Sequence, residues 1–141
     1  MFLRVRRESE HRSSSSRLAV RPRDDGRVVD LVSRDDPLAP PVATVATPTT
    51  IVLLDALCVA WDDGSSALFT SEYEPAVSRS RVRRWDLDAT GTWTSRSVGE
   101  SEDGEIYWWL AVRDGAVVVR EIRTGRTRTV ALASDAERTT P

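Results

Sequence analysis

The sequence contains no lysine, no asparagine and no glutamine, so all twenty of its basic residues are arginines. The codons of these three residues are rich in adenine, and their joint absence therefore indicates a GC-rich prokaryotic genome. Histidine and cysteine are almost missing as well, with His11 and Cys58 as the single examples. One cysteine cannot form an internal disulfide, so nothing in the sequence points to an oxidising compartment.

The shortage of histidine and cysteine restricts the chemistry that the chain can perform. His11 lies in a polar segment where nothing would hold it in a working geometry. Cys58 lies in an apolar run, where it fits a small buried hydrophobe better than a nucleophile. A Ser-His-Asp site, a Cys-His site and a Cys/His zinc site are therefore not expected. We expect a chain without a cofactor, in which only carboxylates could carry chemistry.

Long hydrophobic runs are also absent. The one candidate for a membrane span is 37–54, eighteen residues without a charge, but it contains four prolines. A spanning helix needs about 20 predominantly apolar residues, and prolines remove helical hydrogen bonds. Residues 8–16 are polar throughout, which argues against a secretory signal. The sequence predicts a cytoplasmic protein with no membrane contact.

The charges that are present fall in three blocks. Residues 1–34 carry nine arginines against five carboxylates, residues 35–78 carry seven carboxylates and no base, and the remainder is nearly balanced. A length of 141 residues suits one domain. Composition and charge predict the following organisation: 1–16 a disordered basic arm, 17–36 a β-hairpin, 37–48 a Pro-rich linker or crossover, 49–133 a β domain, and 134–141 a disordered tail.

The glycines give the clearest prediction of fold, because all seven fall where a turn between strands would need one. Asp63-Gly64, Asp103-Gly104 and Asp114-Gly115 are dipeptides favoured in tight primed turns. We therefore predict a mainly β protein of antiparallel hairpins or a meander, forming a small sandwich or barrel. The segment 49–58 stays ambiguous, because a short apolar run fits either a short helix or a buried strand.

The last three predicted strands can be given a register. A two-residue turn at Asp114-Gly115 places Val112 opposite Val117, Leu110 opposite Val119, Trp108 opposite Glu121 and Trp109 opposite Arg120. A second turn at Thr124-Gly125 places Val119 opposite Val130, Val117 opposite Leu132 and Glu121 opposite Arg128. One face is then a Val/Leu patch with an ion pair at one end, and a slip of one residue would reverse every side chain.

The segment 79–85 is the most specific functional pattern. On a strand, Arg79, Arg81 and Arg83 project from one face at a spacing of about 6.6–6.8 Å. Such a row could follow a phosphate backbone, with Trp85 available to stack on a base. The alternative is an edge strand that charge protects against aggregation, which we favour.

Two further patterns concern tryptophans and carboxylates. Trp108 and Trp109 are adjacent and must point to opposite faces of a regular strand, so one of them could lie at a partner surface. The motif from Asp86 through Asp88 to Gly91 resembles the opening of a calcium loop, but Thr90 replaces the third acid and the twelfth position is Ser97. Asp86 and Asp88 are therefore only weak metal candidates, and we predict no metal site.

Three functions remain open. The first is a non-catalytic β domain that binds a protein partner, a ligand or a second copy of itself through a sheet face or edge. The candidate residues for nucleic-acid or partner binding are Arg79, Arg81, Arg83, Trp85, Trp109 and Arg120. The second function is a nucleic-acid-binding module that uses the strand 79–85. A carboxylate-dependent metal-binding enzyme is the third.

Overall fold

The computed structural model describes residues 13–23 and 27–132, which form antiparallel strands joined by short loops. One short 3-10 turn, η1 (Pro75–Val77), interrupts them. The strands of the described part are β1 (Ser13–Pro22), β2 (Val28–Ser33), β3 (Ala43–Ala46), β4 (Val52–Trp61), β5 (Ser66–Glu74), β6 (Arg79–Leu87), β7 (Trp93–Glu100), β8 (Tyr107–Arg113), β9 (Ala116–Glu121) and β10 (Thr127–Leu132). The predicted fold class, mainly β and antiparallel, is confirmed.

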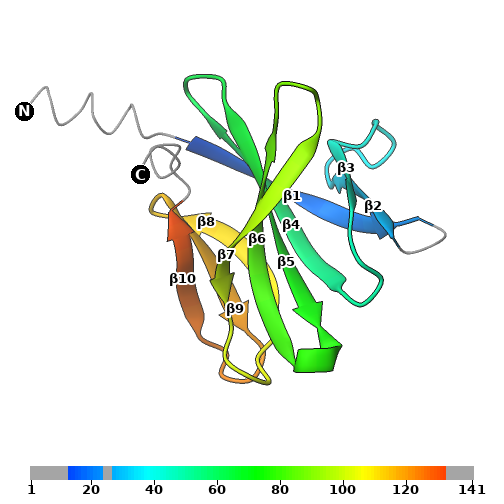
Figure 1. Cartoon of the computed structure of the whole chain (residues 1–141). Helices are drawn as coiled ribbons and strands as arrows, with labels where there is room; N and C mark the ends of the chain where they lie inside the picture. The colour runs from blue at the N-terminus through cyan, green and yellow to red at the C-terminus, as the bar shows by residue number, and fades with distance from the viewer. Residues whose placement is uncertain (1–12, 24–26, 133–141) are drawn as a thin grey trace, which may run out of the picture.

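The strands form two sheets. The larger is seven-stranded, in the order β3-β2-β1-β4-β5-β6-β7, and curls into a half-barrel (Figure 1). The smaller is three-stranded, in the order β10-β9-β8, and packs against the larger one. Since β1 pairs with both β2 and β4, the predicted N-terminal hairpin lies in the middle of the larger sheet.

The helical alternative for 49–58 is wrong, because β4 runs through this segment. Leu57 and Val59 face the smaller sheet, whereas Ala56 packs on the opposite side of the strand. A strand buried on both faces has a continuous apolar sequence without the alternation that marks a half-buried strand. For this reason the periodicity of 49–58 could not decide between a helix and a strand.

Two predicted boundaries also differ from the structure. Ser13 to Ser16 belong to β1 and pair with residues Trp61 to Cys58 of β4, so the predicted disorder of the arm is wrong for 13–16. Within the Pro-rich segment 37–48, β3 pairs with β2. In both cases a neighbouring strand supplies hydrogen bonds to residues that look irregular in the sequence. The rest of the predicted arm, 1–12, and the predicted tail, 134–141, lie outside the described residues.

Two hydrophobic cores lie on opposite faces of the larger sheet. The first fills the space between the sheets, with Leu57 and Phe69 on one side and Leu110 and Val119 on the other, all at most 1% exposed. The second lies inside the curl of the larger sheet; its members are Leu18, Val29, Leu31, Ala43, Val45, Ala56, Leu68 and Trp85.

A fully buried arginine belongs to the first core. The Arg84 guanidinium lies 5.4 Å from the Trp61 ring centroid and 5.6 Å from that of Phe69. Its Nε donates to the Asp86 carboxylate at 3.1 Å. Since a buried charge needs a partner, this ion pair and the two rings allow a guanidinium to remain in an otherwise apolar layer.

The glycine turns are confirmed in part. Asp114 (φ 53°) and Gly115 (φ 77°) both have positive φ, as a primed two-residue turn requires. Gly104 lies in a turn, but β7 and β8 belong to different sheets, so this turn is not a hairpin. Gly99 is not in a turn: it lies within β7, and a Cβ added there would stand 2.9 Å from the Val130 Cβ.

The predicted register between β8 and β9 is confirmed from the turn as far as Trp109, which lies opposite Arg120. A β-bulge then makes Tyr107, and not Trp108, the partner of Glu121. The bulge inserts one residue and so changes which side chain enters the core.

The predicted register between β9 and β10 is wrong. Arg128 lies opposite Val119, because residues 122–125 form a longer loop than the two-residue turn we expected. The predicted ion pair between Glu121 and Arg128 is nevertheless present, with Oε2 and Nη1 3.2 Å apart.

Candidate functional site

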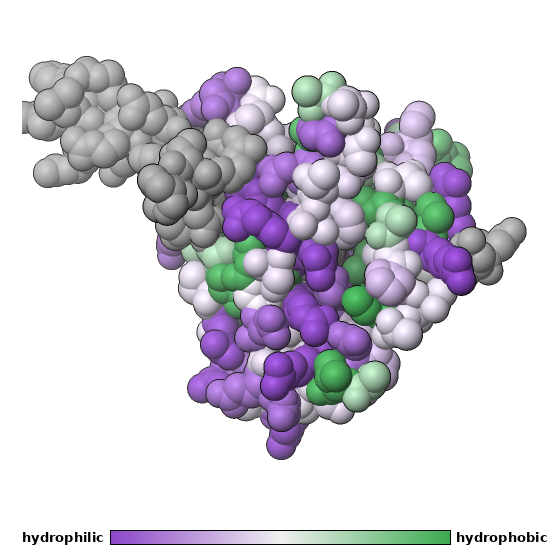
Figure 2. Space-filling model, viewed as in Figure 1, coloured by the Kyte–Doolittle hydropathy of each residue, from purple (hydrophilic) through white to green (hydrophobic). Residues whose placement is uncertain are grey.

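The predicted arginine row lies on β6, as expected, but each guanidinium already has a carboxylate partner. Arg79 Nε donates to Asp103 at 2.8 Å, and Arg81 Nη1 donates to Glu74 at 2.9 Å. Arg83 forms two hydrogen bonds to Glu72, at 3.0 and 3.4 Å. Figure 2 shows a hydrophilic band across the surface over β6 and β7.

Ion pairing explains why the pKa values of two of these arginines rise above their ordinary value. The hydrogen bond that Arg79 donates to Asp103 is the main cause of its raised pKa, and the hydrogen bond that Arg81 donates to Glu74 is the main cause of its raised pKa. Trp85 is only 6% exposed, and its Nε1 donates to Thr70 Oγ1 at 2.9 Å. The strand 79–85 therefore offers neither unpaired cations nor an exposed ring.

Trp109 has a different environment. Its ring centroid lies 5.0 Å from the Arg120 guanidinium, 5.5 Å from that of Arg113 and 5.6 Å from that of Arg17. We call these four residues the arginine–tryptophan cluster. Cations at this distance are attracted to the ring quadrupole, so the indole brings three like charges together.

Within the described residues, the cluster carries more positive charge than its carboxylate neighbours compensate. Of its three arginines, only Arg17 makes an ion pair within the described part of the chain, to Asp55 at 2.7 Å. Arg113 and Arg120 have no carboxylate partner among the described residues, and Arg120 Nε is buried there without a hydrogen-bond acceptor.

The bulge in β8 explains why this ring lies outside the core. Tyr107 is inward-facing and fully buried, so the extra residue leaves both following tryptophans outside the two cores. Our expectation that Trp108 and Trp109 point to opposite faces assumed a regular strand and does not hold. Trp108 is 43% exposed, and Ile122, which follows β9, is 55% exposed. The outer face of the smaller sheet thus combines apolar and cationic groups.

Asp55 anchors the cluster to the body of the protein. Its carboxylate is 2% exposed and accepts hydrogen bonds from the Leu110 and Ala56 amides at 2.8 and 2.9 Å, besides the one from Arg17. Arg34 Nη2 lies 3.5 Å from the same carboxylate. Asp55 therefore joins β4 to β8 and holds Arg17 beside Trp109.

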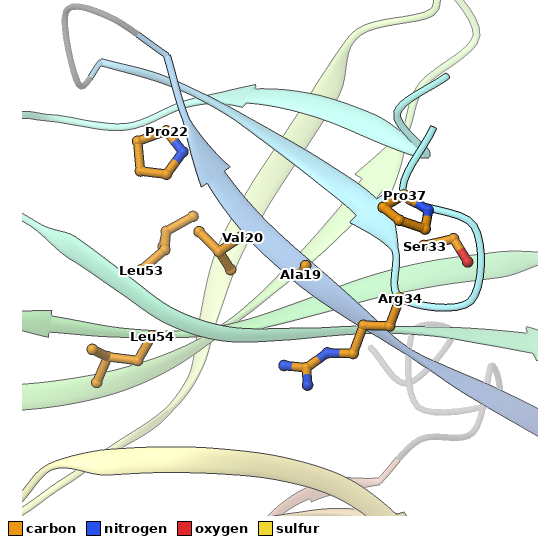
Figure 3. Close-up of a pocket in the computed structure, with 8 residues that line it drawn as sticks. All are labelled: Ala19, Val20, Pro22, Ser33, Arg34, Pro37, Leu53 and Leu54. Atoms are coloured by element: carbon orange, nitrogen blue, oxygen red, sulfur yellow. The ribbon is translucent and has the colours of Figure 1, made fainter. Parts of the chain in front are cut away.

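Two hollows mark other places where the larger sheet is open. One lies where β1 leaves β4 to pair with β2, and Figure 3 shows Arg34 among its lining side chains, most of which are apolar. Its lining residues are Ala19, Val20, Pro22, Ser33, Arg34, Pro37, Leu53 and Leu54. The other hollow lies between the edge strands β3 and β7. It has two adjoining parts, and Trp85 lines both of them.

The remaining candidates have structural partners. Asp86 pairs with Arg84, and Asp88 Oδ1 accepts the backbone amides of Thr90 and Thr92 at 2.9 Å each. The hydrogen bond from the Thr90 hydroxyl is the main reason why the pKa of Asp88 lies below its ordinary value. Partial burial raises the pKa of the Cys58 thiol, which makes it a weaker nucleophile at neutral pH.

Within residues 13–23 and 27–132, no group of three or more His, Cys, Asp or Glu side chains is placed to hold a metal ion. The same residues include no helix of the length and apolarity needed to cross a membrane. Comparison with known proteins gives no match: no family model, no curated protein and no solved structure is similar to this chain.

Sequence reasoning found half of the cluster. The opposition of Trp109 and Arg120 follows from the turn at Asp114-Gly115, but Arg17 and Arg113 were not identified. Arg113 could have been found. It lies two residues after Ala111 in β8, where the pairing with β9 has no bulge, so both residues lie on the outer face of the hairpin. Arg17 could not, since its position depends on how the two sheets pack.

Proposed function

We propose that this chain is a non-catalytic binding domain that takes an acidic protein segment on the outer face of the smaller sheet. The observation that carries the proposal is the Trp109 ring with three guanidinium groups around it, two of which lack a carboxylate partner within the described residues. A carboxylate of the partner would pair with Arg113 or Arg120, and the partner's apolar side chains would pack near Trp108 and Ile122. Tryptophan and arginine are the residues most enriched at the centres of protein interfaces.

A protein partner fits this surface better than a nucleic acid. A nucleic acid binds through a series of protein cations that neutralise the phosphates along its backbone. The arginine row of β6 is not available for this, because carboxylates of the protein already neutralise it. The cluster instead gathers its positive charge around a single ring. It therefore suits one or two carboxylates flanked by apolar groups.

Calorimetry with an acidic, leucine-containing dodecapeptide tests the proposal. We expect saturable binding that weakens as salt rises, and a loss of at least fivefold in affinity for Arg120→Gln. Arg96→Gln is the matched control, because it removes the same charge from an exposed position on β7; it should leave the affinity unchanged. Absence of binding at low salt would overturn the proposal, as would an equal loss with Arg96→Gln.

A single-stranded oligonucleotide of the same net charge provides the competing arm. Tighter binding of the oligonucleotide, lost with Arg120→Gln, would replace the acidic segment by a nucleic acid at this surface. Binding lost only with Arg81→Ala and Arg83→Ala would restore the strand 79–85 as the nucleic-acid site.

A further inference from the structure

We infer that the open side of the half-barrel, between β3 and β7, is a docking site for one extended peptide strand of a partner protein. This surface is distinct from the arginine–tryptophan cluster and does not depend on it. Figure 2 looks onto this side, where apolar surface borders the hydrophilic band towards β3. The inference rests on strand direction, on unpaired backbone groups and on the lining of the hollow.

Strand direction specifies what can close the barrel. Each neighbouring pair in the larger sheet is antiparallel. With seven strands in the sheet, the two edge strands β3 and β7 therefore run in the same direction. Direct closure would require a parallel pair, whereas one added strand can be antiparallel to both edges. A barrel of about eight strands has an interior that side chains can just fill.

Both edges present backbone groups to the gap. Thr47 N–H donates to Arg27 O at 2.7 Å. Bonded and non-bonded pairs alternate along an antiparallel ladder, so the register of β3 with β2 turns the N–H and C=O groups of Thr44 and Ala46 away from β2.

The same reasoning applies to β7, where Asp88 N–H donates to Thr92 O at 2.9 Å. The peptide groups of Trp93 and Ser95 are therefore directed away from β6. Beyond the strand ladders themselves, no backbone hydrogen bond to these four positions occurs among the described residues. Unpaired edges of this kind bind extended segments by strand addition.

The lining of the hollow indicates which side chains the added strand carries. Trp85 and Ile51 provide an apolar floor, and the ion pair of Arg83 with Glu72 borders it. Trp93 and Val45 line the adjoining part. Since side chains alternate along a strand, the segment that fits has aliphatic residues at every second position and polar residues between them.

The test uses the full chain, labelled with nitrogen-15, and the capped heptapeptide Thr-Val-Ser-Val-Thr-Val-Arg as probe. In the free protein, the amides of Ala46 and Ser95 should exchange with solvent at rates within about tenfold of an unstructured peptide, because they are unpaired. Saturating peptide should slow their exchange at least tenfold and shift their resonances. A peptide N-methylated at alternate residues should produce neither effect.

Ser95→Pro provides the matched variant, because proline removes an edge donor that does not pair with β6. It should retain the spectrum of the folded protein and lose at least tenfold in affinity for the heptapeptide. Arg120→Gln should leave this affinity unchanged, which separates this site from the one proposed above. Four results would each overturn the inference: protection of Ser95 in the free monomer, absence of peptide binding, equal binding of the N-methylated peptide, or protection that appears only through self-association.

Discussion

The partner of a charged side chain determines whether that side chain is available for binding. Arg83 and Arg120 both lie on strands and both are partly exposed. Arg83 is held by the buried carboxylate of Glu72, whereas Arg120 faces the ring of Trp109. The contrast between these two arginines, rather than the number of arginines, locates the proposed binding surface.

Replacement of Asp55 by alanine should destabilise the protein by about 2–3 kcal/mol. The change leaves the buried Leu110 amide without an acceptor and removes the main partner of Arg17, whose side chain is exposed enough for water to compensate part of the loss. Urea unfolding measures the effect. The exposed control Asp62→Ala should lie within about 0.5 kcal/mol of wild type. Equal midpoints for all three proteins would contradict this role.

Glu121 should make stability depend on pH on the acid side. Burial raises its pKa, but hydrogen bonds from Thr124, Arg128 and Arg126 outweigh burial, and the net pKa lies below the ordinary value of about 4.5. Its stabilising contribution is therefore present above about pH 4.5 and is lost as the pH falls through the lowered value.

The pH dependence is measured by urea unfolding of wild type and Glu121→Gln between pH 7 and pH 3. The free energy of unfolding of wild type should decrease more steeply below pH 4.5 than that of the variant. Glu102→Gln, at an exposed position, should follow the wild-type curve. Parallel curves for wild type and Glu121→Gln would show that Glu121 does not contribute.

At the scale of elements, the smaller sheet meets the edge of the larger one where β10 crosses β7. Gly99 lies at this crossing, and its φ is not in the positive region, so only the lack of a side chain matters there. Gly99→Ala should cost about 1–3 kcal/mol by overpacking against Val130.

A double-mutant cycle isolates that contact. In the Val130→Gly background, Gly99→Ala should cost less than half as much, because the Val130 Cβ that the new methyl group meets is no longer there. Thermal or urea unfolding of the four proteins gives the coupling energy. Equal costs in both backgrounds would mean that the strain lies elsewhere.

The sequence predicted where strands and turns lie better than it predicted which residues each strand contacts. The turn at Asp114-Gly115 is local, so the pairing of Leu110 with Val119 could be derived from it. The bulge at Trp108 has no local signature, since it arises from packing Tyr107 into the core. The ion pairs of Arg81 with Glu74 and of Arg83 with Glu72 were within reach, because the four-residue connection at 75–78 makes β5 and β6 antiparallel neighbours.

At the scale of the whole molecule, both sheets share the first core. Leu57 and Phe69 from the larger sheet meet Leu110 and Val119 from the smaller one, so neither sheet can bury its apolar face alone. We expect a single cooperative transition, with coincident midpoints by far-ultraviolet circular dichroism and tryptophan fluorescence. A fluorescence change that precedes the circular dichroism change would show that the smaller sheet separates first.

The central place of β1 has a consequence for synthesis on the ribosome. β1 emerges first and can pair with β2 at once, but its pairing with β4 brings Ser13 next to Trp61. Until β4 is translated, the nascent chain therefore carries an open strand edge beside the apolar side chain of Leu18. Such edges attract other unfolded chains, so slow translation between β3 and β4 would prolong the stage at which the nascent chain is prone to aggregate.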